Sequence, residues 1–382
     1  MNSQKIILLL MASALLTACG TKEDDPDNPS AQRRVPLQIS TGIMGSVTRA
    51  FDTTWEQGDA IGVFTTPAGN TTSVTKSGAS YDDANVPYYT ITEEETYVEG
   101  AYVYKPFVNA GTQQVYLPAD GSDVDVYAYY PRNASVSLSN PLPITVTGTS
   151  NPSTPTIPAP QTTAQQKGFD VLSVKASKCA DGTNPINIDH PRVNLMFEHI
   201  MTKVIVYVMA GDGIQESELS DNNVSSVQLL GQPVSATFAP VTRELAITSG
   251  SNTITMQKIL YNAENPDPDY VSTYTKYTKY NDATPPVEEW TKNVLHVYRA
   301  IVLPTNGATG TTNPANNSAR KIQFNVGQTT YTYTITDAFA PGHEMRFAVR
   351  LSASEIQVET VIKNWKSVPI NPNALYPDGE DQ

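Results

Sequence analysis

The sequence Leu195-Met-Phe-Glu-His-Ile-Met-Thr-Lys-Val-Ile-Val-Tyr-Val-Met209 contains the most hydrophobic strand that the chain predicts. Successive side chains of a β-strand point to opposite faces, and in this strand both faces are apolar. One face carries Val204, Val206 and Val208, and the other carries Ile205, Tyr207 and Met209. Because a strand that is apolar on both faces is typical of the interior of a covered sheet, we expect this strand to be central in its sheet.

The same two-residue period recurs along most of the chain. Short runs of alternating apolar residues, bounded by Gly, Pro, Asn and Asp, are typical of strands. The clearest runs lie at 35–43, 59–64, 124–130, 171–175, 195–209, 227–230, 294–303, 322–326, 331–336, 345–351 and 356–362. Segment 214–221 is compatible with a short helix, and no stretch keeps helical spacing over three turns. Strands joined by loops rather than by helices predict an all-β protein built of antiparallel β-sandwiches.

The length of the chain allows two domains. A chain of 382 residues is long enough for two cores at about 100–200 residues per domain. We place the boundary at the Asp-His-Pro turn before the hydrophobic segment, which gives an N-terminal domain at 35–190 and a C-terminal domain at 191–366. Residues 133–166 and 261–293 are long and polar, and we expect surface excursions there because such loops are uncommon inside compact domains.

Composition and charge limit the classes of partner that the chain is expected to bind. The formal net charge is −13, which argues against nucleic acid and anionic lipid headgroups, since both require a basic face. Charged residues make up 16% of the chain, against about 25% in typical soluble domains. The sequence has 2 cysteines, and if one carries lipid, no intramolecular disulfide is possible.

The first residues predict export. Lys5, an apolar run at 6–16 and the sequence Leu16-Thr-Ala-Cys19 form a signal peptide at 1–18 that ends in a lipobox. The apolar run is shorter than the about 20 residues that a membrane-spanning helix needs. The Leu-Thr-Ala-Cys order resembles the recognition site of the lipoprotein signal peptidase, which implies that Cys19 becomes the acylated N-terminus. An ordinary secretory signal with a coincidental cysteine is the alternative.

An acidic tether follows at 19–34. Its sequence after Cys19, Gly-Thr-Lys-Glu-Asp-Asp-Pro-Asp27, has nothing to bury and predicts a disordered segment. It resembles the acidic export signal that directs lipoproteins of Bacteroides-type bacteria to the outer face of the outer membrane. A plain solvated linker is the alternative.

Motifs for catalysis, cofactors and metals are incomplete. The four histidines at 190, 199, 296 and 343 are scattered, and Phe347 stands where a zinc-protease motif starting at His343 needs its second histidine. We expect Cys179 in a loop with no evident base nearby, and His199 as a hydrogen-bonded core residue. Trp55 and Trp365 are expected to fill the core at strand ends. The sequence therefore predicts no enzyme, no cofactor and no metal site.

Several local patterns, taken together and in this order, resemble the fimbrillin family of Bacteroides-type bacteria, including its Mfa-like branch. They are Thr48-Arg-Ala50, Trp55-Glu-Gln-Gly-Asp-Ala-Ile-Gly-Val-Phe64, Val126-Tyr-Ala-Tyr-Tyr-Pro131, Phe197-Glu-His-Ile-Met-Thr-Lys-Val204, Ile301-Val-Leu-Pro304 and Ile362-Lys-Asn-Trp365. The resemblance implies two transthyretin-like β-sandwich domains in tandem and export to the cell surface as an outer-membrane lipoprotein. It also implies polymerisation with other pilin subunits into a fimbrium that supports adhesion and biofilm formation.

The resemblance further implies assembly by proteolysis and strand exchange. A trypsin-like surface protease would cut between Arg49 and Ala50 and release the strand within 35–49. The tail at 367–382 would act as the donor strand through Val368, Ile370 and Leu375. Cleavage at Arg33 or Arg34, which would only trim the tether, is the alternative.

Two other function classes remain open on the sequence alone. A surface glycan-binding lipoprotein of a nutrient-uptake system would present aromatic rings on one concave face, and Tyr270, Tyr274, Tyr277, Tyr280 and Trp290 are candidates for such a set. Tyr alternating with Thr is equally typical of an edge strand. A hydrolase is the third class, and it lacks a motif to support it.

Overall fold

The computed structural model describes a defined part of the chain. The described residues are 35–43, 55, 58–76, 83–90, 107–109, 113–146, 149–150, 159–221, 223–248, 251–264, 267–278, 287–305, 320–353 and 355–365. Cys19, Arg49, Ala50, Val368, Ile370 and Leu375 lie outside them, as do the tether and the C-terminal tail. Within the described residues the chain is all-β, with one short α-helix, α1 (Thr163–Phe169), and one 3-10 helix, η1 (Glu216–Leu219). Neither helix is long and apolar enough to span a membrane.

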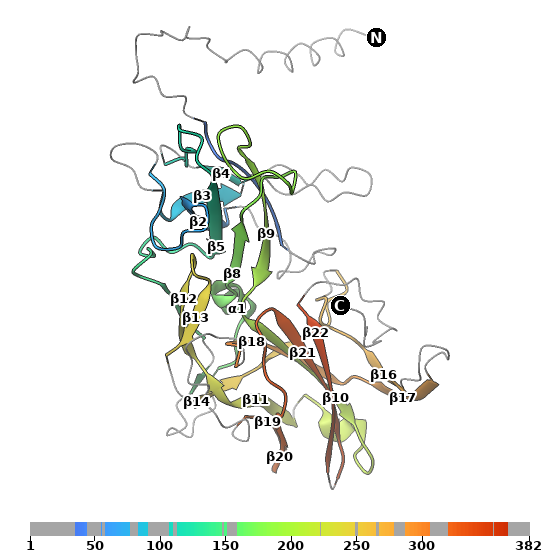
Figure 1. Cartoon of the computed structure of the whole chain (residues 1–382). Helices are drawn as coiled ribbons and strands as arrows, with labels where there is room; N and C mark the ends of the chain where they lie inside the picture. Colours follow the sequence, from blue (N-terminus) through green and yellow to red (C-terminus); the bar gives the residue numbers. More distant parts are fainter. Residues whose placement is uncertain are drawn as a thin grey trace, which may run out of the picture.

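The first part of the chain forms a seven-stranded sheet, here called the N-terminal sheet (Figure 1). Its spatial order is β1 (Gln38–Ile43), β9 (Arg192–His199), β8 (Leu172–Ala176), β5 (Val124–Tyr130), β2 (Ala60–Pro67), β3 (Val86–Thr90) and β4 (Phe107–Asn109). β1 runs parallel to β9, and the other neighbours are antiparallel. One face of this sheet covers a core that includes Ile61, Val126 and Leu195.

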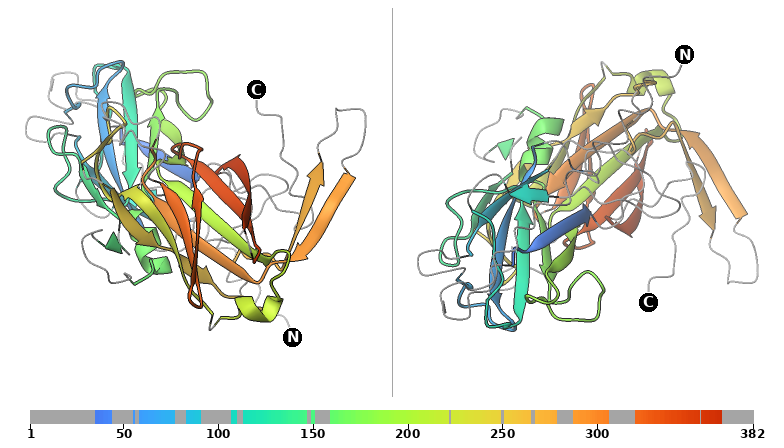
Figure 2. Two further views of the ribbon diagram at one scale, coloured as in Figure 1. Left: turned by 90° about the horizontal axis from the view of Figure 1, so that it is seen from below. Right: turned by 90° about the horizontal axis from the view of Figure 1, so that it is seen from above.

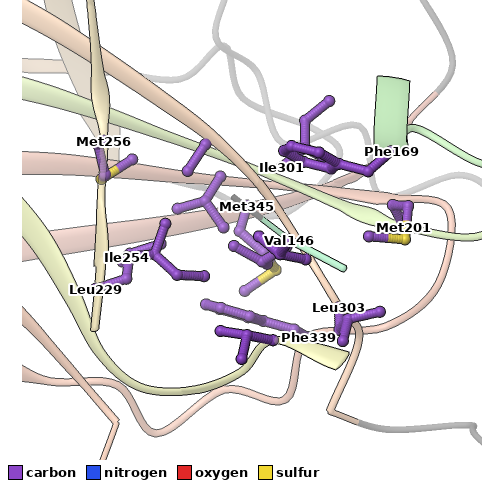
Figure 3. Close-up of a cluster of buried hydrophobic side chains, with 14 of the residues drawn as sticks. Val146, Phe169, Met201, Leu229, Ile254, Met256, Ile301, Leu303, Phe339 and Met345 are labelled. Carbon is purple, nitrogen blue, oxygen red and sulfur yellow. The ribbon is translucent and has the colours of Figure 1, made fainter. Parts of the chain in front are cut away.

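Two five-stranded sheets form the C-terminal sandwich. One has the order β15 (Gln257–Ile259), β18 (His296–Val302), β10 (Thr202–Ala210), β21 (His343–Leu351) and β22 (Ile356–Asn364). The other has the order β20 (Thr329–Thr334), β19 (Lys321–Val326), β11 (Val224–Pro233), β14 (Ser251–Thr255) and β7 (Thr149–Ser150). Leu229 and Ile254 from the second sheet lie opposite Ile301 and Met345 from the first, in the largest core of the molecule (Figure 3).

The hydrophobic segment 195–209 contains most of β10, and β10 is central in its sheet, as predicted. It lies between β18 and β21. Val204, Val206 and Val208 enter the core between the two five-stranded sheets. The residues of its other face, Ile205, Tyr207 and Met209, belong to a separate buried cluster. Both faces of β10 are therefore covered.

The two long polar segments contain strands rather than only loops. In the first, β6 (Leu142–Thr145) joins a three-stranded sheet with β12 (Ser235–Ala239) and β13 (Glu244–Ile247), and β7 pairs with β14. Val136, Ile144 and Val146 enter the largest core together with Tyr127 and Tyr129 from β5. This segment therefore crosses from the N-terminal sheet to the C-terminal sandwich. In the second segment, β16 (Thr273–Thr278) and β17 (Val287–Asn293) form a hairpin that projects from the sandwich (Figure 2).

The chain changes sheets at 200–201, within the segment that was expected to form one strand. We expected one strand over 195–209, but β9 ends at His199 and β10 starts at Thr202. Ile200 N donates to Val171 O in the loop before β8, at 3.0 Å, whereas Met201 O accepts from Gly342 N just before β21, at 2.9 Å. Since successive residues take partners from different sheets, β9 completes the N-terminal sheet and β10 begins the sandwich.

Candidate assembly site

Strand β1 occupies one edge of the N-terminal sheet. Its ladder with β9 runs in parallel register from Gln38 opposite Arg192 to Ile43 opposite Phe197. The residues before it pair with 115–117, where Leu37 N donates to Val115 O at 3.0 Å and Leu117 N donates to Val35 O at 2.9 Å. A strand at a sheet edge can be exchanged without breaking the sheet in two.

The inner face of β1 is buried. Leu37, Ile39 and Thr41 are 1%, 7% and 1% exposed, while Gln38 between them is exposed. Leu37 and Ile39 belong to the same cluster as Leu195 and Phe197 of β9. Burying an aliphatic side chain of this size stabilises a fold by about 1.5–3 kcal/mol. Removing β1 would therefore open an apolar groove that needs another strand to cover it.

The described outer-face side chains of β1, Gln38 and Ser40, make local polar contacts. Arg192 Nε donates to Gln38 Oε1 at 3.0 Å, and Ser40 Oγ donates to Asn194 Oδ1. Both pairs are exposed, and exposed polar pairs contribute little to stability. The attachment of β1 rests mainly on backbone hydrogen bonds and on alternate apolar side chains. Any chain segment with the same alternation can supply both.

Trp365 fixes the point from which the C-terminal tail departs. It follows β22, is 4% exposed, and its N–H donates to Gly342 O at 2.6 Å. Its ring stacks on His199 with centroids 3.8 Å apart and planes 8° from parallel. His199 belongs to β9 and forms a hydrogen bond between Nδ1 and Asp170 Oδ1 at 2.9 Å. The tail therefore starts at the junction between the N-terminal sheet and the C-terminal sandwich.

A cluster of buried charges lies next to Trp365. Lys203 Nζ is 5.3 Å from the Trp365 ring centre, 2.8 Å from Glu344 Oε2 and 3.2 Å from Asp269 Oδ1. Arg299, which is fully buried, contacts Asp269 Oδ2 at 2.9 Å. Burial by itself would raise the pKa of Asp269, but Lys203 and Arg299 outweigh burial and hold this pKa below its ordinary value. Because the ion pairs join β10, β18 and β21, the cluster serves to fix these strands against one another.

Of the aromatic residues considered for sugar binding, Tyr274 is buried, whereas Tyr270, Tyr277 and Trp290 are half-buried. Tyr274 is 3% exposed and lies against Trp290 and Tyr207, with centroid distances of 5.7 and 6.3 Å. Tyr270 is partly buried against the same cluster, and Tyr280 lies outside the described residues. Tyr207, Tyr274 and Trp290 therefore pack against one another where the β16–β17 hairpin meets the sandwich.

Of the other residues considered in the sequence, Trp55 and His199 lie where they were expected, whereas Cys179 has neighbours that were not expected. Trp55 and His199 are buried as expected, with Trp55 edge-on to Phe197 at 5.1 Å. Cys179, expected without a base nearby, instead lies beside Asp181 and His190 in the loop between β8 and β9. The positions of the histidines in the sequence did not predict this grouping, because Cys179 and His190 are eleven positions apart and meet only when the loop folds back. The Cys-x-Asp pattern at 179–181 is the sequence signal that points to the group.

The fold defines an all-β protein built of sandwich-like sheets, and comparison with known sequences gives its family. The profile of the family described as Fimbrillin-like matches residues 48–365. The chain therefore belongs to the fimbrillin-like family, which consists of fimbrial subunits and not of enzymes.

Comparisons with individual proteins are consistent with this family assignment. The fimbrium subunit Fim1C of Bacteroides uniformis is 28% identical over 253 residues, which cover 66% of this chain and 70% of that protein. The crystal structure of a protein from Bacteroides uniformis described as a cell adhesion protein has a TM-score of 0.55 at 20% identity, covering 88% of this chain and 99% of that one. A similar protein from Bacteroides ovatus has a TM-score of 0.54 at 18% identity, covering 87% and 98%. These two structures support the fold.

Proposed function

We propose that the chain is a structural and adhesive subunit of a cell-surface fimbrium, exported as a lipoprotein on Cys19 and assembled by donor-strand exchange. In this proposal its body consists of two transthyretin-like β-sandwiches in tandem, and its polymer supports adhesion and biofilm formation. The observation that carries the proposal is the position of β1, an edge strand whose buried face covers the core of the N-terminal sheet. Strand addition at a sheet edge is a recognised mode of assembly between protein chains.

A trypsin-like surface protease would start the exchange by cutting between Arg49 and Ala50. The family match begins at residue 48, so β1 precedes the matched region and Arg49 falls at its start. Once β1 leaves, its groove would accept the tail of another subunit, which presents Val368, Ile370 and Leu375.

The sequences of β1 and the tail share a pattern that suits this replacement. The chain enters β1 as Val35-Pro-Leu37, and the tail contains Val368-Pro-Ile370. Pro36 forms a bridge with Tyr116 at the start of the edge, where the missing N–H of proline is tolerated. Ile370 would then take the buried place of Leu37.

A reversible cross-link between β1 and β9 tests the proposal. Ser40 and Asn194 lie opposite each other in the ladder, so the double variant Ser40→Cys/Asn194→Cys can form a disulfide that keeps β1 in place after cleavage. We expect the oxidised protein to remain monomeric and the reduced protein to polymerise, as judged by electron microscopy and by ladders on denaturing gels. Each single variant should polymerise. Polymers that form while the cross-link is intact would rule out exchange of β1.

The lipid anchor has a separate test. We expect Cys19→Ala to abolish incorporation of a labelled fatty acid and to leave the precursor in the inner membrane or the periplasm, because stable anchoring requires acyl chains. Cys179→Ala removes the other cysteine of the chain and should leave labelling unchanged. Equal labelling of Cys19→Ala and the wild type would show that Cys19 is not the acylated residue.

A further inference from the structure

The loop between β8 and β9 gathers three side chains that differ in type and suit a transition metal. The Sγ of Cys179, a carboxylate oxygen of Asp181 and a ring nitrogen of His190 all lie within 4.8 Å of one another. Cys179 is buried, Asp181 is exposed and His190 is half-buried, so the group is open to solvent on one side. Among the described residues this is the one group of three or more such side chains close enough to share an ion.

The backbone of the loop holds Cys179 in place. Cys179 N donates to Asn184 O at 2.8 Å, and Cys179 O accepts from Gly182 N at 2.9 Å. Gly182 has a φ of +74°, a conformation that favours glycine and closes the turn. Ala180 N donates to Arg192 O at 2.8 Å, which ties the loop to β9. The thiol is therefore carried by a closed turn.

The Asp181 carboxylate is also fixed in position. Its Oδ1 accepts from Thr183 N at 2.7 Å and from Asn184 N at 2.9 Å, and its Oδ2 accepts from Asn184 Nδ2 at 2.8 Å. These contacts hold a carboxylate oxygen of Asp181 within 4.8 Å of the Cys179 Sγ.

His190 reaches the pair from the far end of the loop. Its backbone N–H donates to Asn187 O at 3.0 Å and to Asn187 Oδ1 at 3.2 Å, which forms a second closed turn. The next residue, Pro191, precedes β9 and its carbonyl accepts from Gln38 N at 2.9 Å. Both ends of the loop are anchored, so the three side chains meet without the ordering cost of a free loop.

We propose that Cys179, Asp181 and His190 form a binding site for a divalent transition-metal ion of the zinc type. Thiolate, imidazole and carboxylate are the three ligand types that zinc takes in proteins, at about 2.3, 2.0–2.1 and 2.0–2.2 Å. Mixed sulfur and nitrogen ligands select zinc over calcium and magnesium, which prefer oxygen. On binding, the Cys179 thiol loses its proton to solvent, and a carboxylate oxygen of Asp181 becomes a ligand. Three protein ligands leave the fourth tetrahedral position open to water.

Metal titration of the full chain tests this site independently of assembly. The protein carries Cys19→Ala, so that Cys179 is its sole thiol, and it carries no affinity tag. We expect one Zn²⁺ per chain by isothermal titration calorimetry, and a thiolate-to-metal charge-transfer absorption band when Co²⁺ is used as the probe. Zn²⁺ should also raise the thermal unfolding midpoint, because binding to the folded state alone stabilises it.

Matched variants locate the ion. Cys179→Ser and His190→Gln should each weaken Zn²⁺ binding by on the order of 10–100-fold or more, since loss of outer-shell partners alone has effects of that size. Cys179→Ser should also abolish the charge-transfer band. Asp189→Asn, at an exposed acidic residue beside His190, should bind as the parent protein does. A parent protein that binds no Zn²⁺, or binding unchanged by both ligand variants, would overturn the proposal.

Discussion

Replacing Val206 with aspartate is expected to prevent folding of the C-terminal sandwich. Val206 is fully buried, lies in the middle of β10 and is paired on both sides, with Tyr298 of β18 and Phe347 of β21. An unpaired carboxylate in such a place costs several kcal/mol, a large share of the about 5–15 kcal/mol that stabilises a typical protein. Circular dichroism and thermal unfolding of the purified variant would measure the loss.

The chain offers the same substitution at an exposed valine as a control. Val287, at the start of β17, is 55% exposed, and Val287→Asp should change the unfolding midpoint little, because its carboxylate stays in water. A soluble Val206→Asp protein with the unfolding profile of the wild type would contradict the central placement of β10.

Replacing Arg49 with alanine is expected to give a folded monomer that does not polymerise. The uncut chain would keep β1 in its edge position with Leu37 and Ile39 buried, so no groove would open for a donor strand. Stability of the monomer should remain close to that of the wild type, since the substitution changes no residue of β1. Size-exclusion chromatography after treatment with a trypsin-like protease would separate monomer from polymer.

Two variants and one sequencing experiment distinguish this site from its neighbours. Arg33→Ala and Arg34→Ala should polymerise normally, because cleavage there would leave β1 attached. N-terminal sequencing of wild-type polymer should give a start at Ala50. A start before Val35 would contradict strand release.

The period-two pattern predicted most strands because it reports local burial. The double-sided apolar pattern of β10 identified a central strand, and the alternating run at 35–43 identified β1. The break at 200–201 was not visible in the pattern, because Ile200 and Met201 are as apolar and as buried as their neighbours. That break depends on partners, Val171 and Gly342, that are distant in sequence.

Polar composition was the least reliable predictor of burial and of strand formation. Residues 133–166 were expected as a surface excursion, yet Ile144 is a core residue. Residues 261–293 do form a projecting hairpin, although Tyr274 within it is buried. A few apolar side chains among many Thr, Ser and Pro are enough to form short strands when a neighbouring strand supplies the hydrogen bonds. The parallel pairing of β1 with β9 and the meeting of Cys179 with His190 likewise depend on chain closure, which residue types alone do not report.

The stacked Trp365 has a mechanical consequence. If the tail after Trp365 is held in the groove of another subunit, any pulling force along the fibre enters this folded body at the tryptophan. In sequence, Trp365 stands between the tail and the nine paired residues of β22 on β21, so load from the tail meets its contact with His199 before it meets those hydrogen bonds. Trp365 then acts as the first resistance to tension, and the strength of a single fibre would depend on this aromatic contact before it depends on any sheet.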